Sequence, residues 1–542
     1  MATSATPAER VADVLAWLAV TAPGAALSSD SRRIAPGEVF LAYAAASEDG
    51  RPADGRAFIA DAIARGACAV IHDEHGFVWN PLWTVPHFGL ADLHAVAGTL
   101  ASLHYGQPDR TMACIAVTGT NGKTSCTQWL GAALSGSGVP TAVIGTFGIG
   151  LFEQGNSGPS AVTGYTTPDA VQLQRALADL RERGAVAVAI EASSIGLQQE
   201  RMQGMHVDVA LLTNLTRDHL DYHGDMAAYE AAKTRLFDWP GLQHAVINLD
   251  DAMGVRLVVH LRATAPAVQL IGYTRAAVRG ASSVSEVANV LDISDLGPGG
   301  MLLRAGEIRG SHAGSQFQLT TVTADTNDTA TTVAKISVKT QLVGDFNVSN
   351  VLGVLGVLLA RGMPVAAAIA SVEALQPVAG RMQQIGGPDQ PLVVIDYAHT
   401  PDALEKTLAS LRGLANDRAG ELWCVFGCGG GRDPGKRPQM GAIAQAADHV
   451  IVTSDNPRSE LPAAIIADIV AGIAADRAPQ VIEDRATAIL WALRHAGKHD
   501  VILLAGKGHE NYQEIKGRKL QFLDADHAAL ALAARATMKG PH

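Results

Sequence analysis

The sequence predicts an α/β protein built on parallel β-sheets. Short runs of β-branched and other apolar residues alternate with longer segments of helical periodicity through most of the 542 residues, a pattern typical of parallel strands joined by crossover helices. Unusual polar residues directly follow several of these runs, and open α/β sheets bind ligands beyond the carboxyl ends of their strands. The predicted strands are residues 39–42, 114–117, 186–190, 209–212, 392–395, 423–426, 449–452 and 501–504.

The length and composition predict several domains. With 48% hydrophobic residues and 55 glycines the chain can bury more than one core, and three or four domains are expected for its size. A helical pattern stops near residues 105–108, and a second one, over residues 351–375, is followed by Pro377. We therefore expect domains at 1–106, 107–379 and 380–542. Residues 276–340 are rich in Ser, Thr, Ala and Gly, which predicts an irregular or antiparallel excursion.

Charge and cysteine content argue against several classes of protein. The net charge of −11 disfavours non-specific binding of nucleic acid, which requires a basic surface. We expect no membrane span and no secretory signal, because no apolar run is long enough and the first thirty residues carry interspersed charges. The five cysteines are scattered and odd in number, which argues against a disulfide framework or a zinc site. A cytoplasmic protein fits these features.

An acidic chain that binds an anion must hold it with local cations. Four basic residues gather in one stretch of the sequence, although a solvated surface is the alternative explanation. They are Arg432, Lys436, Arg437 and Arg458.

A glycine-rich segment indicates phosphate binding. The residues from Gly119 to Thr124 follow a predicted strand and open a helical pattern, as a phosphate-binding loop does. Its glycines allow backbone N–H groups to point at phosphate oxygens, while Lys123 neutralises the terminal phosphates and the Thr124 hydroxyl binds Mg²⁺. The spacing is two residues shorter than in the common motif, which disfavours a generic kinase or GTPase. A plain glycine-rich turn is the alternative.

Potential metal ligands follow the next two strands. Glu191 comes directly after one strand, and residues 213–224, which include His219, come after the other. Both groups should reach the crevice of the phosphate loop. A helix predicted from Met226 to Leu236 carries Lys233. Taken alone, His219 could be a core histidine and Lys233 a solvated helix residue.

The ordered series of motifs resembles the Mur ligases. The resemblance runs along essentially the whole chain, and so long an ordered series is highly specific. It rests on GTNGKT (119–124), EASS (191–194), the TNL segment (213–224), YEAAK (229–233), GDFNVSN (344–350), GRM (380–382) and DYAHTP (396–401).

The resemblance implies a three-domain architecture in which an N-terminal uridine-nucleotide domain precedes a central P-loop ATPase domain and a C-terminal Rossmann-like domain. It implies ATP and Mg²⁺ as cofactors. Thr124 and Glu191 would hold one Mg²⁺, and His219 with a carbamylated Lys233 would help to hold a second; a carbamate suits the hard cation, whereas an ammonium does not. The catalytic set so implied is Lys123, Glu191, His219 and Lys233.

The same resemblance assigns binding residues. Contacts to ATP are expected from Gly119, Thr120, Asn121, Gly122, Lys123, Thr124, Ser125, Asn347, Arg381, Asp396 and His399. Contacts to a UDP-muramoyl dipeptide are expected from Ser29, Ser31, Thr166, Thr167, Ser193, Gln199 and Arg201. Two segments depart from the family pattern: residues 44–50 replace a Gly-His-Gln type of sequence, and Ile195 replaces a common His.

A motif after the strand at 449–452 indicates which amine is added. Arg458 can pair with a carboxylate through two parallel hydrogen bonds, although an exposed turn with a chance arginine is the alternative. The motif resembles that of the family members that add meso-diaminopimelate; members that add lysine lack this arginine. Diaminopimelate has a second amino-acid end, so an additional cationic anchor suits it. Its expected contacts are Arg432, Asp455, Asn456, Pro457, Arg458, Gly506 and Glu510.

The implied function is ATP-dependent ligation of meso-diaminopimelate to the γ-carboxylate of D-Glu in UDP-N-acetylmuramoyl-L-Ala-D-Glu. We expect a monomer, with association to other Mur ligases as a further possibility. A folylpolyglutamate-synthetase-like ligase is one alternative, disfavoured by the long N-terminal region and the Arg458 motif. A catalytically silent muropeptide-binding module is another, disfavoured by the intact set of metal-binding residues.

Overall fold

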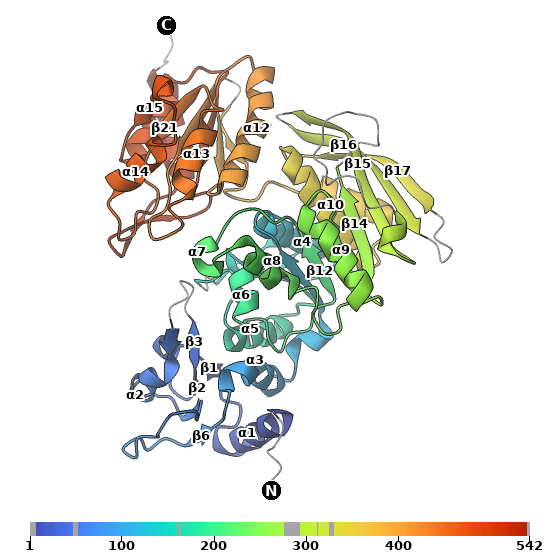
Figure 1. Cartoon of the computed structure of the whole chain (residues 1–542), viewed down its shortest axis with the longest axis vertical. Coiled ribbons are helices and arrows are strands. Elements are labelled where there is room, and N and C mark those ends of the chain that lie inside the picture. Colours follow the sequence, from blue (N-terminus) through green and yellow to red (C-terminus); the bar gives the residue numbers. More distant parts are fainter. Residues whose placement is uncertain are drawn as a thin grey trace.

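The computed structural model describes residues 7–46, 52–158, 160–161, 164–275, 293–311, 313–324, 330–387 and 389–538. Three larger sheets follow one another along the long axis of the molecule, from the N-terminal end to the C-terminal end (Figure 1). Their strands lie within residues 27–89, 113–340 and 383–521, respectively, counting a small hairpin beside the last sheet. The domain boundaries predicted after residues 106 and 379 remain predictions.

The N-terminal sheet is small and parallel. Its order is β1-β2-β5-β6, and apolar side chains such as Leu41 and Ile71 pack against the helices that flank it. A short hairpin, β3–β4, lies beside it. The elements are α1 (Pro7–Thr21), β1 (Leu27–Ser28), β2 (Val39–Ala42), β3 (Ala44–Ala46), β4 (Pro52–Asp54), α2 (Ile59–Ala64), β5 (Ala69–His72), β6 (His87–Gly89) and α3 (Leu93–His104).

The central sheet has its topological switch point at β7. Strands β11 and β12 flank β7 on its two sides and run parallel to it, so the loops after all three strands open into one crevice. The elements are β7 (Ala113–Thr118), α4 (Lys123–Gly136), β8 (Thr141–Gly145), β9 (Gly148–Glu153), β10 (Asn156–Ser157), α5 (Ala170–Glu182), β11 (Ala187–Glu191), α6 (Ser194–Gln198), β12 (Val209–Leu212), α7 (Leu220–His223), α8 (Met226–Thr234), β13 (His244–Asn248), α9 (Ala252–Thr264) and β14 (Gln269–Thr274).

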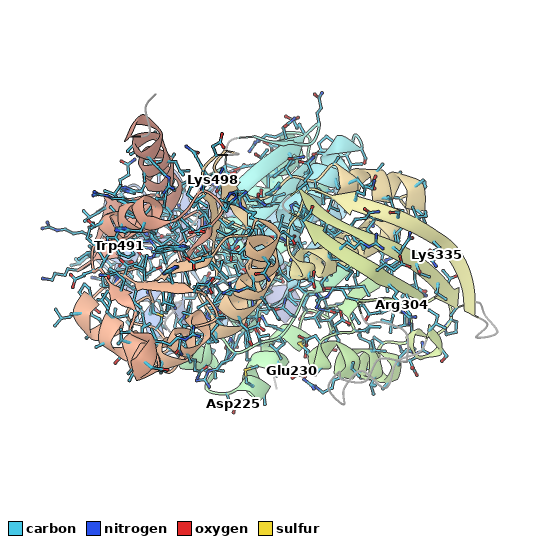
Figure 2. All side chains as sticks on the ribbon, turned by 90° about the horizontal axis from the view of Figure 1, so that it is seen from above. Asp225, Glu230, Arg304, Lys335, Trp491 and Lys498 are labelled. Atoms are coloured by element: carbon cyan, nitrogen blue, oxygen red, sulfur yellow. The ribbon has the colours of Figure 1, made fainter. Side chains whose placement is uncertain are left out.

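An antiparallel ladder extends this sheet, as the composition of residues 276–340 predicted. Strands β15 (Met301–Ser311), β16 (Gly314–Ala324) and β17 (Ala330–Thr340) follow β14 at the edge of the sheet. Residues 276–292 and 325–329 of that prediction lie outside the described residues. Seen from above, the ladder with Lys335 lies on the opposite side of the molecule from Trp491 in the C-terminal part (Figure 2).

The C-terminal sheet has the order β18-β19-β23-β20-β21-β22, and only β18 runs antiparallel to its neighbour. Helices cover both faces. The elements are β18 (Gln383–Ile385), β19 (Leu392–Asp396), α12 (Pro401–Asp417), β20 (Leu422–Phe426), α13 (Lys436–Ala444), β21 (His449–Val452), α14 (Pro462–Val470), β22 (Gln480–Val481), α15 (Arg485–His495), β23 (Val501–Ala505), β24 (Tyr512–Ile515), β25 (Arg518–Gln521) and α16 (Asp524–Met538).

All eight predicted strands are present, with ends that differ by one residue at most. The helix predicted over residues 351–375 is wrong in extent, because two helices occupy this region. They are α10 (Asp345–Ala360) and α11 (Val365–Glu373). Gly362 adopts φ +79° and Pro364 lacks an N–H donor, so the chain turns between them.

A buried ion pair stabilises the entry to the central sheet. His206 lies between two carboxylates: Nδ1 is 2.9 Å from Asp109 Oδ2, and Nε2 is 3.4 Å from Asp208 Oδ2. Cys114 Sγ is 3.7 Å from the same Nδ1. Because each ring nitrogen faces a carboxylate, the geometry is that of a doubly protonated imidazole. These carboxylates raise the pKa of His206 to about 11.

Among the described residues, no helix is both long enough and apolar enough to cross a membrane.

Candidate active site

A cavity of about 850 Å³ lies between the central and C-terminal sheets. Its wall is formed by the carboxyl ends of strands in both sheets, including Glu191 of β11, Asp396 of β19, and the loops after β7, β12, β20, β21 and β23. The polar residues that follow the predicted strands therefore meet in one place. Although the chain is acidic, many basic side chains reach this wall: Lys123, Lys233, Arg275, Arg381, Lys406, Arg432, Lys436, Arg458 and Lys519.

The phosphate loop connects β7 to α4 at the base of the cavity. Gly122 adopts φ +86°, and a Cβ at this position would come within 2.5 Å of Asn350 Oδ1 in α10, so both backbone conformation and space require glycine. The Lys123 ammonium donates hydrogen bonds to the carbonyls of Gly119 (2.7 Å) and Thr120 (2.9 Å). Lys123 thus lies over the N-terminus of α4, the end of a helix that attracts phosphate.

Thr124 and Glu191 form a pair of oxygen ligands beside this loop. The Thr124 hydroxyl donates to Glu191 Oε2 at 3.0 Å, close to the separation of adjacent ligands around Mg²⁺ at about 2.1 Å. The other carboxylate oxygen, Oε1, accepts from the Thr146 N–H at 2.8 Å. Because this hydrogen bond orients the carboxylate, the pair fits an octahedral Mg²⁺ site.

Lys233 enters the same region from α8. Its side chain is 1% exposed, its Nζ donates to the Gly119 carbonyl at 2.8 Å, and it lies 4.4 Å from the centroid of the Tyr229 ring. Burial, followed by the nearby Lys123 charge, places the pKa of Lys233 well below its ordinary value. The amine is therefore readily deprotonated, and a neutral amine is the form that adds CO₂. The alternative explanation of Lys233 as a solvated helix residue is thus excluded.

His219 and His399 meet at a shared carboxylate between the two sheets. Asp218 Oδ2 lies 3.4 Å from His219 Nε2 and 3.8 Å from His399 Nε2. His219 adopts φ +54°, an uncommon backbone conformation that turns it into the cavity wall. Burial, followed by the Lys436 charge, lowers the pKa of His399 to about 4, so this imidazole is neutral at pH 7.

The C-terminal part supplies a direct bridge to the phosphate loop. Arg381 Nη2 donates to the Thr124 hydroxyl at 3.2 Å, and its guanidinium lies 4.3 Å from the centroid of the Tyr397 ring. Asn121 in the loop also donates to Asp402 in α12 at 3.2 Å. Asn347, Asp396 and His399 line the adjacent wall. The nucleotide-binding residues expected from the sequence are thus gathered from both sheets.

A second polar network lies on the other side of Glu191. The Thr167 hydroxyl donates to the Glu191 carbonyl at 2.7 Å and lies 2.9 Å from Ser193 Oγ. Arg201 donates to the Thr167 carbonyl and to the Gln199 side chain, at 3.0 Å and 2.7 Å. Thr166 and Ser193 line the cavity, whereas Thr167, Gln199 and Arg201 form the layer behind them.

A third group of polar side chains lines the part of the cavity formed by the C-terminal sheet. It contains both cations and carboxylates. Arg458 adopts φ +51°, and its backbone is held by β24, since its N–H donates to the Glu514 carbonyl at 3.0 Å. Its guanidinium donates to the Gly430 carbonyl at 2.6 Å. Asp455, Asn456, Gly506, Glu510 and Arg432 line the same region. Arg458 Nε also lies 3.7 Å from Glu514 Oε2. The cavity thus offers both cationic and carboxylate side chains, which suits a zwitterionic amino-acid end.

The comparisons with known proteins agree with this geometry. Residues 117–358 match the Mur ligase middle domain, and residues 380–508 match the Mur ligase, glutamate ligase domain. A protein of Janthinobacterium sp. (strain Marseille) is 61% identical over 527 residues, covering 97% of each chain. One from Ralstonia nicotianae is 51% identical over 535 residues, again covering 97% of each. Both are named UDP-N-acetylmuramoyl-L-alanyl-D-glutamate--2,6-diaminopimelate ligase.

The chain belongs to the Mur ligase family. A solved structure of a ligase with the same printed name is 35% identical, with a TM-score of 0.60 over 94% of this chain and 95% of that one. The MurF ligase of Thermotoga maritima in complex with ADP (16% identical, TM-score 0.59) covers 95% of this chain and 99% of its own. The folylpolyglutamate synthase of Mycobacterium tuberculosis (18% identical, TM-score 0.57) covers 83% and 96%; these two show the fold alone. The resemblance and the multidomain α/β architecture predicted from the sequence are confirmed.

One expectation about the basic cluster is corrected by this Mur ligase structure. Arg437 is 3% exposed and pairs with Glu460 and Asp468, each at 2.9 Å, so its charge holds α13 to its neighbours and is not available to a ligand. Ser29 and Ser31, expected at the uridine nucleotide, belong to the N-terminal part and do not line this cavity. Ser31 is buried, and Ser29 donates to Asp169, the residue that caps α5, at 2.7 Å. Their role stays a prediction. Residues 47–50 of the atypical segment lie outside the described residues.

Pro457 also does not line the described cavity wall. Its carbonyl instead lies where a Cβ of Gly430 would stand, so only glycine at position 430 lets the two loops approach this closely. Ile195 lines the cavity at the position where the family commonly has a histidine.

Sequence reasoning missed several residues of the site. Asp218 and Tyr397 lie within motifs that were recognised, and Asp402 directly follows one of them, yet their contacts depend on the approach of two separate sheets. Lys507 was also missed. It belongs to the segment 506–510. Only its burial in the folded chain distinguishes it from an ordinary surface lysine, and the local sequence does not reveal that burial.

Proposed function

We propose that this Mur ligase uses ATP to join meso-diaminopimelate to the γ-carboxylate of D-Glu in UDP-N-acetylmuramoyl-L-Ala-D-Glu. The observation that carries the proposal is the arrangement of the cavity. It brings the phosphate loop, the Thr124–Glu191 pair and the Arg458–Glu510 end into one enclosure. The names of the relatives at 61% and 51% identity support the same reaction.

The chemistry proceeds through an acyl phosphate. The γ-carboxylate attacks the terminal phosphorus of ATP and ADP leaves; the amine of diaminopimelate then attacks the acyl carbon, and phosphate departs from the tetrahedral intermediate. Lys123 stabilises charge on the transferred phosphoryl group, and Arg381 reaches the same place from the C-terminal sheet. The enclosing sheets align the amine and exclude water from the acyl phosphate.

Magnesium neutralises phosphate charge when bound. Thr124 and Glu191 would hold one ion. His219 and Lys233 as a carbamate would help to hold a second, and the buried, readily neutral amine of Lys233 supports that modification. ATP contacts are proposed for Gly119 to Ser125, Asn347, Arg381, Asp396 and His399. The site of the UDP-muramoyl dipeptide is proposed to comprise Ser29, Ser31, Thr166, Thr167, Ser193, Gln199 and Arg201.

The compartment proposed is the cytoplasm, and the working form a monomer. All five cysteines are free thiols, as a reducing compartment favours. Association with other Mur ligases is compatible with this proposal.

The test is phosphate release with ATP, Mg²⁺, UDP-muramoyl dipeptide and either meso-diaminopimelate or lysine. We expect turnover with diaminopimelate and at least a hundredfold lower kcat/KM with lysine. Equal turnover with the two amines contradicts the proposed specificity. Turnover only with a folate substrate and glutamate supports a folylpolyglutamate synthase, whose fold this chain shares. Absence of any substrate-dependent ATP hydrolysis supports a silent binding module.

A further inference from the structure

Lys507 is a buried cation that the mechanism above does not use. Its side chain is 0% exposed, and it follows β23 at the C-terminal end of the cavity. Its ammonium donates to Glu510 Oε2 and to Asn456 Oδ1, each at 3.1 Å. A buried ammonium is costly unless it is paired, so this lysine needs both acceptors.

The two contacts determine the orientation of the Asn456 amide. Asn456 Oδ1 accepts from Lys507 and also from the Glu514 N–H at 2.9 Å. Because both neighbours are donors, the oxygen must face them, and Nδ2 must face Glu510, to which it donates at 2.7 Å. Exchanging the oxygen and nitrogen of the amide would set donors against donors. Lys507 therefore orients a side chain that lines the cavity.

The same contacts leave one oxygen of Glu510 available. Among the described residues, the hydrogen bonds to this carboxylate come from Asn456 and Lys507, and both go to Oε2. Glu510 is part of the cavity wall and its side chain is 16% exposed. Oε1 is thus free for a cationic group of a ligand, and the Arg458 guanidinium, which suits a carboxylate, lines the same cavity.

Apart from Lys507 and Asn456, the surroundings of Glu510 disfavour the ionised form of its carboxyl group. Burial, followed by the nearby Asp455, raises the pKa of this carboxyl group, while Lys507 acts in the opposite direction. A protonated Glu510 could not pair with an ammonium. The charged and titratable groups that act on Glu510 or respond to it are Asp455, Lys507, Tyr397, Arg485 and Tyr512.

We propose that Lys507 is a positioning residue for the incoming amino acid: it holds Oε2 of Glu510, leaves Oε1 for the ammonium of a zwitterionic end, and orients the Asn456 amide beside it. Lys507 does not touch the reacting atoms. This inference rests on the proposed function, because the zwitterion is the distal end of diaminopimelate.

The test is to measure KM for each of the three substrates in variants of Lys507. In Lys507→Met we expect KM for diaminopimelate to rise at least tenfold at pH 7, while KM for ATP and for the UDP-muramoyl dipeptide stays within about twofold. The rise should shrink as the assay pH is increased, because Glu510 without its lysine is ionised to a greater extent at higher pH. If Lys507→Met does not fold, Lys507→Gln is measured in its place. Its side chain is also uncharged, so the same changes in KM are expected.

Two comparisons distinguish positioning from simple stability. Glu510→Gln should raise KM for diaminopimelate at every pH, and adding Lys507→Met to it should change KM no further. Arg418→Met is the stability control, since Arg418 donates to the Gln390, Lys498 and His499 carbonyls and does not line the cavity; its three KM values should stay unchanged. An unchanged KM for diaminopimelate in Lys507→Met, or an equal and pH-independent rise of all three constants, overturns the proposal.

Wild-type turnover is measured first. Failure of the wild type to use diaminopimelate refutes the proposed function, whereas normal wild-type turnover with unaltered Lys507 variants refutes only the role of Lys507.

Discussion

At the scale of single residues, burial decides the chemistry of this site. Lys233 and Lys507 are both lysines with almost no exposed surface, yet their partners differ. Lys507 has a carboxylate partner and an amide oxygen, which offset the cost of burying its charge. Lys233 has a carbonyl, an aromatic ring and a nearby lysine, surroundings that favour a neutral amine.

Lys233→Ala should lower kcat by about a hundredfold, because it removes the proposed carbamate ligand of Mg²⁺. A small carboxylic acid added to the assay should restore part of the activity by replacing the carbamate. Lys498→Ala, at an exposed lysine, should behave like the wild type with and without the acid. Full activity of Lys233→Ala rules out the metal role.

Arg458→Ala should raise KM for diaminopimelate roughly thirtyfold, equivalent to about 2 kcal/mol for a lost charged hydrogen-bonding partner. KM for ATP should not change, because Arg458 lies at the other end of the cavity from the phosphate loop. Initial rates at varied diaminopimelate and at varied ATP separate the two effects. A parallel increase of both constants argues against a specific contact to the amino acid.

At the scale of elements, close approach of backbones holds α3 to the central part of the chain. A Cβ at Gly98 in α3 would collide with the Gln203 carbonyl, and one at Gly204 would meet the Gly98 carbonyl. The helix can therefore pack at this distance only because both residues are glycines. Gln203 also accepts from the Gly98 N–H at 3.1 Å.

Gly98→Ala should lower the free energy of unfolding by about 1–3 kcal/mol, because the new methyl group must push α3 away from residue 203. The matched control is Gly413→Ala in α12, where a Cβ meets nothing within 4 Å; it should raise stability by about 0.5–1 kcal/mol through helix propensity. Urea unfolding of both variants measures the two effects. Equal stabilisation by both substitutions contradicts the packing described.

At the scale of the whole molecule, separate sheets are joined by polar contacts. Arg381 and Asn121 bridge the central and C-terminal parts at the phosphate loop, and Arg217 pairs with Asp433 at 3.3 Å.

The His206 ion pair joins Asp109, which follows the first predicted domain, to Asp208 before β12. The stability of the chain should therefore depend on pH through a group far from the active site.

His206→Gln should lower the free energy of unfolding by about 3 kcal/mol near neutral pH, because it leaves two carboxylates buried without their cation. The pKa of His206 is 6.5 in the unfolded chain and about 11 in the folded one. Its charge therefore stabilises the fold fully below pH 6.5, and this stabilisation is lost as pH rises towards about 11. The difference from the wild type should thus shrink between pH 7 and 10 in urea unfolding. His260→Gln, at an exposed pair with Asp238, should have little effect. A constant difference across this range excludes the ion pair.

Much of the fold was predictable because it depends on local pattern. The eight strands were recognisable as short apolar runs, and the phosphate loop as glycines between a strand and a helix. Glu191 could be assigned to the same crevice, because parallel strands place their carboxyl ends together. The break between α10 and α11 was missed, since the apolar pattern continues across Gly362 and Pro364.

Local sequence was therefore sufficient for the α/β class, the strands and the chemistry of each motif, because periodicity and turn chemistry act over a few residues. The tertiary structure alone decided which charges are available. It paired Arg437 with Glu460 and Asp468, buried Lys233 beside the phosphate loop, and placed Lys507 between Asn456 and Glu510. Burial and pairing depend on residues that are distant in the chain, and they determine whether a charged side chain binds a ligand, supports a neighbour or loses its proton.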